Sequence, residues 1–181
     1  MNKLMRAMNE DLFGSSNAVQ THEKLIIQTV IKFMNAKFGI NPKITVKKKN
    51  STTLIGDVIM NTNSLYNNKF TVHFNPKMSY VTIIQALFHE LTHVKQMSKG
   101  ELGANSNWDA ITWMGKEYIT VTDYNKLLKG GKRDAYVKLP WEVEAIKNQH
   151  DSSLFNQWLK SPFVSKIRNK DVNVDFILDN L

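Results

Sequence analysis

Residues 79–96 have the sequence SYVTIIQALFHELTHVKQ, which predicts the central helix of the protein. Apolar residues occupy more than one side of this helix, a pattern typical of a helix buried in the core. His89 and His93 are four residues apart, so on a helix their imidazoles lie one turn apart on the same face. Buried imidazoles need polar partners, and one metal ion can satisfy both. The stretch therefore predicts a metal site on a buried helix.

Glu90 lies one position after the first histidine, beside the two candidate ligands and not in line with them. A carboxylate in that place can act as the general base toward a metal-activated water. The alternative is a surface helix that carries the pattern by chance, with Glu90 paired to a lysine. The expected burial of the helix argues against that alternative. A zinc-dependent peptidase is therefore the first hypothesis.

The histidine pair leaves such a site one ligand short, because a catalytic zinc usually has three protein ligands. The chain contains no cysteine, so the third ligand must be a histidine or a carboxylate. The other histidines are isolated, and isolated histidines are more often structural or exposed: His22, His73 and His150. Glu142 and Glu144 are stronger candidates, because the run PWEVEA at 140–145 predicts the start of a second helix.

Length and composition predict one folded domain over residues 1–181, with a loosely ordered segment at 1–18. Of the 181 residues, 42% are apolar and 22% charged. A chain of this length and composition can form a stable hydrophobic core without disulfides or structural metal ions. The absence of cysteine excludes disulfides and mildly favours a reducing compartment. The first residues lack the apolar core of a signal peptide, and no run is long enough to span a membrane. We therefore expect a cytoplasmic or particle-associated protein that is not secreted by a signal peptide.

Hydrophobic periodicity predicts the elements before the motif helix. Residues 21–37 carry a helical apolar stripe. Three β-branched or alternating runs predict strands of a small sheet: 43–48, 53–60 and 70–74. Ser79 is a suitable N-cap for the motif helix, and Lys99-Gly100 is a suitable end.

The segment after the motif helix has weaker signals. Residues 110–121 suggest a hairpin that turns near Gly115, and residues 140–149 predict a helix. Residues 171–180 suggest a short closing helix or an extended tail. The little regular structure expected from Glu101 to Leu139 favours the walls of a cleft.

The net charge of +8 is unevenly distributed along the chain. The segment from Lys24 to Lys77 has nine lysines and a single acid, Asp57. Such a segment can contact nucleic acid or an acidic protein. The alternative is an ordinary solvated surface, and no aromatic stacking pattern accompanies the charge. We therefore expect at most a weak contact of this kind.

The motif and its downstream acid together show a resemblance to a known family. His89-Glu90-x-x-His93 followed by Glu142-x-x-Ala145 resembles the gluzincin branch of the zincins. The resemblance implies that Glu142 is the third zinc ligand and that Ala145 lets two helices pack closely. Many gluzincins place Asp or Asn one position later to brace a ligand histidine, but Ile146 stands there in this chain. Glu144 is the alternative for the brace or for the ligand itself.

Four motifs over residues 79–148 also resemble predicted metallopeptidases encoded by tailed bacteriophages. They are HELTHVKQ at 89–96, GEL at 100–102, WMGK at 113–116 and YVKLPWEVEA at 136–145. This resemblance implies a location in the infected host cell or in the virion. In related zincins a tyrosine donates to the oxyanion of the intermediate, and Tyr136 is the candidate here. A packed loop tyrosine is the alternative for Tyr136.

Together these observations predict an α+β, zincin-like domain. An N-terminal helix and a small, mostly antiparallel sheet lie over the central HExxH helix, and a C-terminal helical part completes the site. The expected function is hydrolysis of peptide bonds with Zn²⁺ bound by His89, His93 and Glu142 and with Glu90 as general base. An endopeptidase acting on an extended peptide or protein is expected more than an exopeptidase. The competing hypothesis is a basic binding module, or a phage particle or host-interaction protein, with a structural or inactive zinc site.

Overall fold

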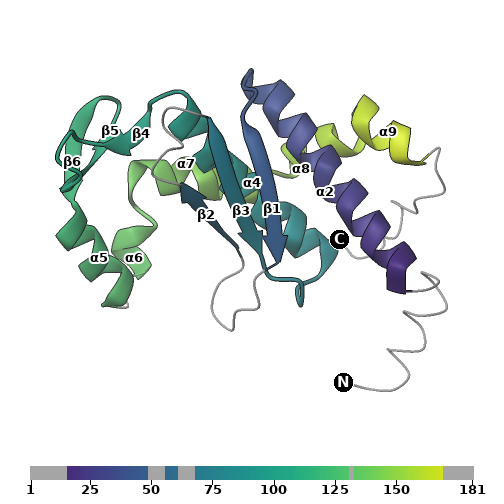
Figure 1. The fold of residues 1–181 in the computed structure, drawn as a ribbon, viewed down its shortest axis with the longest axis horizontal. Coiled ribbons are helices and arrows are strands. Elements are labelled where there is room, and N and C mark those ends of the chain that lie inside the picture. The colour runs from purple at the N-terminus through teal and green to yellow at the C-terminus, as the bar shows by residue number, and fades with distance from the viewer. Residues whose placement is uncertain (1–15, 49–55, 61–67, 131–132, 169–181) are drawn as a thin grey trace.

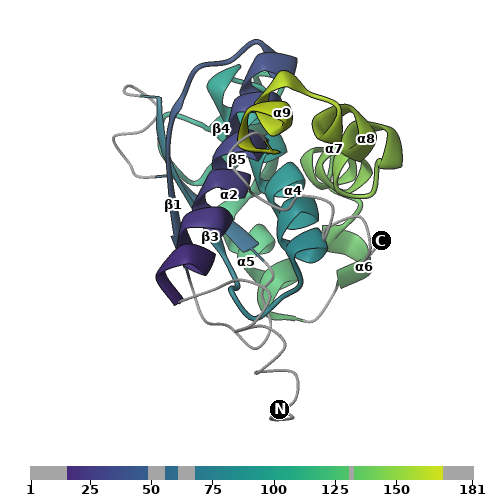
Figure 2. The ribbon, with the colours of Figure 1, turned by 90° about the vertical axis from the view of Figure 1, so that its right-hand side faces the viewer.

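Helix α4 (Tyr80–Ser98) lies at the centre of the fold, between a three-stranded sheet and the C-terminal helices (Figure 1, Figure 2). The fold is known from a computed structural model, which describes residues 16–48, 56–60, 68–130 and 133–168. The other elements, in chain order, are α2 (Ser16–Phe38), β1 (Lys43–Lys48), β2 (Gly56–Met60), β3 (Lys69–Phe74), β4 (Leu102–Ala104), β5 (Ala110–Trp113), β6 (Lys116–Thr120), α5 (Val121–Lys129), α6 (Arg133–Tyr136), α7 (Pro140–Gln149), α8 (Ser152–Leu159) and α9 (Pro162–Arg168). The α+β class expected from the sequence is confirmed.

Helix α4 begins and ends where its local sequence predicts. The Ser79 side chain accepts a hydrogen bond from the backbone N–H of Thr82 and caps the first turn. Lys99 is the C-cap, and Gly100 follows with φ +70°, a conformation that glycine adopts without strain. The main core packs around the helix, with buried residues from α2, β3, α8 and α9. The predicted burial of the motif helix is therefore confirmed.

The first sheet differs in one respect from the expected, mostly antiparallel arrangement. Its order is β1-β3-β2, with β3 antiparallel to β2 but parallel to β1. Strands β1 and β2 are consecutive in the chain and yet lie on opposite edges. Alternation of apolar and polar residues predicts which side chains face the core, but it does not encode the order or direction of strands. The prediction was therefore wrong for the β1–β3 pair.

A second sheet, β4-β5-β6, follows α4 and is antiparallel throughout. The predicted hairpin is present, and its turn contains Met114 and Gly115, both with positive φ. Positive φ at both turn residues matches the twist of a two-residue hairpin. Strand β4 and helices α5 and α6 were not predicted. Helix α5 has a half-buried apolar stripe of Val121, Tyr124 and Leu127, but with nine residues it is too short to stand out from the loop sequence around it.

Helix α7 packs against α4 and has the predicted bounds. Its buried residues are Trp141, Glu142 and Ala145, and the Ala145 side chain is 0% exposed. A hydrogen bond from Asn148 Nδ2 to Thr92 Oγ1, 3.0 Å long, joins the two helices near the C-terminal end of α7. A small residue on the packed face allows two helices to approach closely. Helix α7 is thereby held beside the motif.

The chain ends lie partly outside the described residues. Residues 16–18 belong to α2 and are helical, so the expectation of a loosely ordered segment over 1–18 was wrong for these three; residues 1–15 are outside the described ranges. The predicted closing segment at 171–180 is outside them too. Helix α8 follows α7 as a separate helix, Ser152–Leu159. Among the described helices, none combines the length and the apolar character that a membrane span requires.

Replacing Ala145 by leucine should force α7 away from α4. Overpacking of a closed core costs about 1–3 kcal/mol, and we expect the free energy of unfolding in urea to fall by that amount. The control is Val143→Leu on the same helix, because Val143 is 52% exposed. A surface change of this kind should alter the unfolding free energy by no more than about 0.5 kcal/mol. Equal effects of the two substitutions would contradict close packing at Ala145.

Candidate metal centre

The structure brings His89, His93 and Glu142 together in one group that can hold a metal ion. The two histidines come from α4 and the glutamate from α7. The Nε2 atoms of His89 and His93 are 3.2 Å apart. Glu142 Oε2 lies 3.4 Å from His89 Nε2, and Glu142 Oε1 lies 3.4 Å from His93 Nε2. We call this group the His89–His93–Glu142 cluster.

The spacing is compatible with one metal ion, because one ligand atom from each of the three residues lies within 4.8 Å of the others. Ligand atoms bound at about 2.0–2.1 Å with tetrahedral angles lie about 3.3 Å from one another. Two atoms of the cluster, His89 Nδ1 and Glu142 Oε2, are buried without a hydrogen-bond partner among the described residues. Unsatisfied buried polar atoms are costly, and a metal ion bound to the cluster would give Glu142 Oε2 a partner. The cluster therefore has both the spacing and the donor set for a divalent metal.

The charges in the cluster also suit a metal. Burial by itself raises the pKa of Glu142, but the imidazoles of His89 and His93 and the Tyr136 hydroxyl outweigh it and bring the pKa to about 2. Burial lowers the pKa of His93, but the carboxylates of Glu142 and Glu90 outweigh it and raise this pKa above its usual value. Glu142 is thus ionised at neutral pH, as a metal ligand must be.

Glu90 is 7% exposed and lies beside the cluster without belonging to it. Its charge acts on His93 and also on Tyr124 in α5. Burial raises the pKa of Tyr124, and the charges of Glu142 and Glu90 raise it further. Glu90 is therefore a buried carboxylate whose charge acts on the cluster.

Tyr136, the last residue of α6, contacts the cluster directly. Its hydroxyl donates a 2.6 Å hydrogen bond to Glu142 Oε1. Burial raises the pKa of Tyr136, so the hydroxyl is protonated and able to donate. In this structure Tyr136 therefore orients the carboxylate of Glu142.

An aromatic cluster connects the site with the second sheet. Trp141, which precedes Glu142, is buried and has ring contacts with Trp113, Tyr118 and Tyr124 at centroid distances of 6.1, 5.4 and 6.3 Å. Tyr124 in turn contacts the ring of Tyr136 at 6.2 Å. The weakly patterned segment after α4 thus supplies the wall around the start of α7. Tyr124 was not singled out from the sequence, because one tyrosine on an exposed helix carries no motif.

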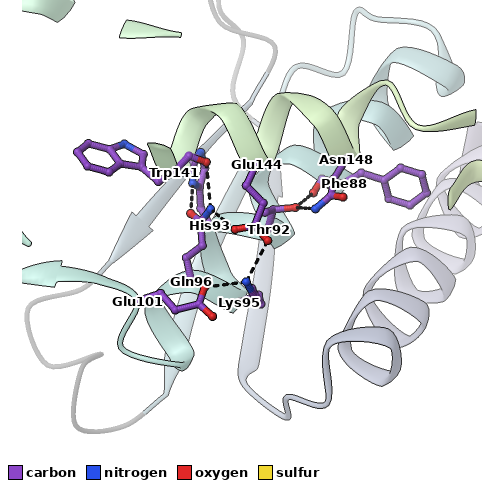
Figure 3. Close-up of polar contacts among 9 residues, drawn as sticks. All are labelled: Phe88, Thr92, His93, Lys95, Gln96, Glu101, Trp141, Glu144 and Asn148. Atoms are coloured by element: carbon purple, nitrogen blue, oxygen red, sulfur yellow. Dashed lines mark hydrogen bonds and ion pairs between the residues drawn. The ribbon is translucent and has the colours of Figure 1, made fainter. Parts of the chain in front are cut away.

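The structure distinguishes Glu142 from Glu144, the two acids that the sequence left open as the third metal ligand. Glu142 belongs to the cluster, whereas Glu144 accepts hydrogen bonds from Lys95 Nζ and Gln96 Nε2 (Figure 3). Burial raises the pKa of Glu144, but Gln96 and Lys95 outweigh it, so this pKa is lower than usual. Glu101 is paired with Lys95 at 2.7 Å. Glu144 is therefore not in the cluster.

Gln96 is the residue of the site that sequence reasoning missed. Its Oε1 atom lies 2.9 Å from His93 Nδ1 (Figure 3). The other ring nitrogen, His93 Nε2, faces His89 and Glu142. The available signal was its spacing, because residues three apart on a helix are neighbours. Of the other histidines, His73 and His150 are outside the only group of three or more candidate ligands found among the described residues, and the His22 side chain is not described.

Comparisons with known proteins add no assignment. No protein-family model matches the chain, and no curated protein or solved structure matches it significantly. The interpretation of the site therefore rests on its geometry and chemistry.

The purified protein should bind one divalent metal ion per chain through this cluster. Glu142→Ala removes an anionic donor from the cluster and should abolish stoichiometric binding. Glu144→Ala should still bind one ion per chain at saturating metal, because Glu144 lies outside the cluster. Elemental analysis after dialysis against zinc measures both. Loss of the metal in Glu144→Ala with retention in Glu142→Ala would contradict the assignment.

Proposed function

We propose that the protein is a zinc-dependent metallopeptidase of the zincin type. The observation that carries this proposal is the His89–His93–Glu142 cluster with the buried carboxylate of Glu90 beside it. Two imidazoles and one carboxylate form a donor set typical of a catalytic zinc, which keeps its fourth position for water or substrate. A structural zinc site usually has four protein ligands. The donor count therefore favours catalysis over a structural role.

The residues of the chain have distinct roles in the proposed reaction. His89, His93 and Glu142 would hold a zinc ion, which would lower the pKa of a bound water and polarise the scissile carbonyl. Glu90 takes the proton of the attacking water and passes it to the leaving amine. Tyr136 holds Glu142 through its hydroxyl, which keeps the carboxylate in place beside His89 and His93. The resemblance suggests that the Tyr136 hydroxyl donates to the oxyanion. In that role the hydroxyl would have to give up its hydrogen bond to Glu142 during the reaction.

An extended peptide is the substrate class that this arrangement fits. Strand β2 is at the edge of the first sheet, and it packs against α4, which carries both histidines. An edge strand can hold an extended chain by backbone hydrogen bonds. We propose that a substrate paired with β2 lies near the cluster, which favours internal peptide bonds and hence an endopeptidase. The resemblance to phage-encoded metallopeptidases supports a role in an infected cell or a virion.

A second candidate function rests on the outer face of the first sheet. Lys43 and Lys47 on β1 and Lys69 on β3 are exposed, and Lys43 is opposite Lys69 in the register. Adjacent exposed lysines form an anion-attracting surface. We propose that this face makes a weak, salt-sensitive contact with nucleic acid or an acidic protein.

Glu90→Gln should abolish peptide cleavage without removing the metal. The amide cannot accept a proton, and loss of a general base costs about 10²–10⁴ in rate. Cleavage of a peptide library, followed by mass spectrometry, gives the activity, and elemental analysis gives the metal content. Equal cleavage by the wild type and Glu90→Gln would refute the assigned role of Glu90. A wild type that holds zinc but cleaves no peptide would contradict the peptidase proposal.

Binding to the lysine face should weaken steeply with salt. For contacts with nucleic-acid phosphates, the logarithm of the affinity falls linearly with the logarithm of salt, by about 0.7–0.9 per contact. Replacing Lys43, Lys47 and Lys69 together by glutamine should reduce that slope by about 2–3. Fluorescence anisotropy of a labelled oligonucleotide measures the slope. An unchanged slope in the triple variant would show that these lysines are not involved.

A further inference from the structure

We propose that Gln96 is a positioning residue that sets the tautomer of His93, and that Glu144, Lys95 and Glu101 hold Gln96 in place. The inference depends on the metal centre of the proposed function but not on its peptidase activity. Gln96 comes from the motif helix itself, three residues after His93. A hydrogen-bond network behind one ligand thereby prepares that ligand for the metal.

The partners of the Gln96 amide determine how it is oriented. The side chain is 0% exposed, and its Nε2 atom is 3.0 Å from both the backbone oxygen of Trp141 and Glu144 Oε2 (Figure 3). A carbonyl and an ionised carboxylate can only accept hydrogen bonds. The NH₂ group must therefore face these two oxygens, and Oε1 must face His93.

This orientation decides where the proton of neutral His93 resides. Gln96 Oε1 lies 2.9 Å from His93 Nδ1 and can only accept, so Nδ1 carries the hydrogen. In the neutral ring Nε2 then has a free lone pair, and Nε2 is the atom that faces Glu142 and His89. A metal ligand needs such a lone pair. Gln96 thus selects the tautomer that can bind metal.

Charged side chains at the helix surface extend the network. Lys95 Nζ donates to Glu144 Oε1 at 2.9 Å and to Glu101 Oε2 at 2.7 Å. The backbone N–H of Glu101 donates to the backbone oxygen of Gln96 at 2.8 Å. The ammonium of Lys95 favours the ionised form of Glu144, which keeps Glu144 an acceptor toward Gln96. The network therefore reaches from His93 to the residue that precedes β4.

The two histidines differ in this respect. His89 Nδ1 is buried and has no hydrogen-bond partner among the described residues, whereas His93 Nδ1 is bound by Gln96. Of the two rings, His93 is the one whose Nδ1 is bound by a described side chain, and this bond sets its tautomer. His93 is therefore the ligand that is prepared before the metal arrives.

A purely structural role for Gln96 is the competing explanation, because its bond to Trp141 also joins α4 to α7. Asn148 offers a matched control, since it joins the same helices through Thr92 and is not one of the three residues of the cluster. Gln96→Leu and Asn148→Ala should both lower the free energy of unfolding in urea. Gln96→Leu should also weaken zinc affinity by about 10–100-fold, the usual effect of removing a group that orients a ligand. Asn148→Ala should leave the affinity within about twofold, as measured by chelator competition.

Exchange of donor and acceptor tests the polarity of the network. Gln96→Glu keeps an acceptor for His93 but places a second carboxylate against Glu144, and zinc affinity should fall. Adding Glu144→Gln restores a donor opposite the new carboxylate, and the double variant should recover affinity relative to Gln96→Glu. No recovery in the double variant would overturn the proposed polarity.

The tautomer itself can be observed without metal. Nitrogen-15 NMR of histidine in the metal-free protein, above the pKa of His93, should show the proton on Nδ1 in the wild type and in Asn148→Ala. Gln96→Leu should shift the ring toward the Nε2–H form. Protonation of Nε2 in the wild type would overturn this inference. Failure of the wild type to bind zinc would instead overturn the proposed metal centre, so the two failures are distinguishable.

Discussion

The close packing of α7 on α4 is the contact on which the candidate site depends. The two histidines are on one helix and the carboxylate is on the other, so the cluster exists only while the helices are held together. Ala145, with no exposed surface, permits the approach. The Asn148–Thr92 hydrogen bond and the Gln96–Trp141 hydrogen bond maintain it at two levels along the helices (Figure 3). Packing and chemistry therefore share the same interface.

Buried polar groups in this interface are nearly all paired, and the exceptions are informative. Gln96, Thr92 and Glu144 each have partners across the helix pair. The described buried atoms without one include His89 Nδ1 and Glu142 Oε2, both in the cluster. Because an unsatisfied buried polar atom costs about 1–3 kcal/mol, the unsatisfied Glu142 Oε2 in an otherwise satisfied network indicates a site that is completed by a ligand.

The second sheet and α5 contribute a wall and no candidate metal ligand. Trp141 packs against Trp113 and Tyr118, which ties the first turn of α7 to the hairpin. Tyr136 reaches Glu142 from the short helix α6. Elements that are only weakly patterned in the sequence thus surround the carboxylate, and they restrict its access to water. Lower water access strengthens the electrostatic interactions within the cluster.

The sequence by itself determined the α+β class, the caps and burial of α4, and the placement of His89, Glu90 and His93 on one helix. These features follow from local geometry, because helix periodicity and capping involve residues within four positions of each other. Only the tertiary structure decided that Glu142 and not Glu144 meets the histidines, that β1 is parallel to β3, and that Gln96 supports His93. Residues two apart on a helix point about 200° apart, so Glu142 and Glu144 cannot both face α4. The rotation of α7 about its axis therefore decides which of them meets the histidines. That rotation is set by contacts between segments that are distant in the chain.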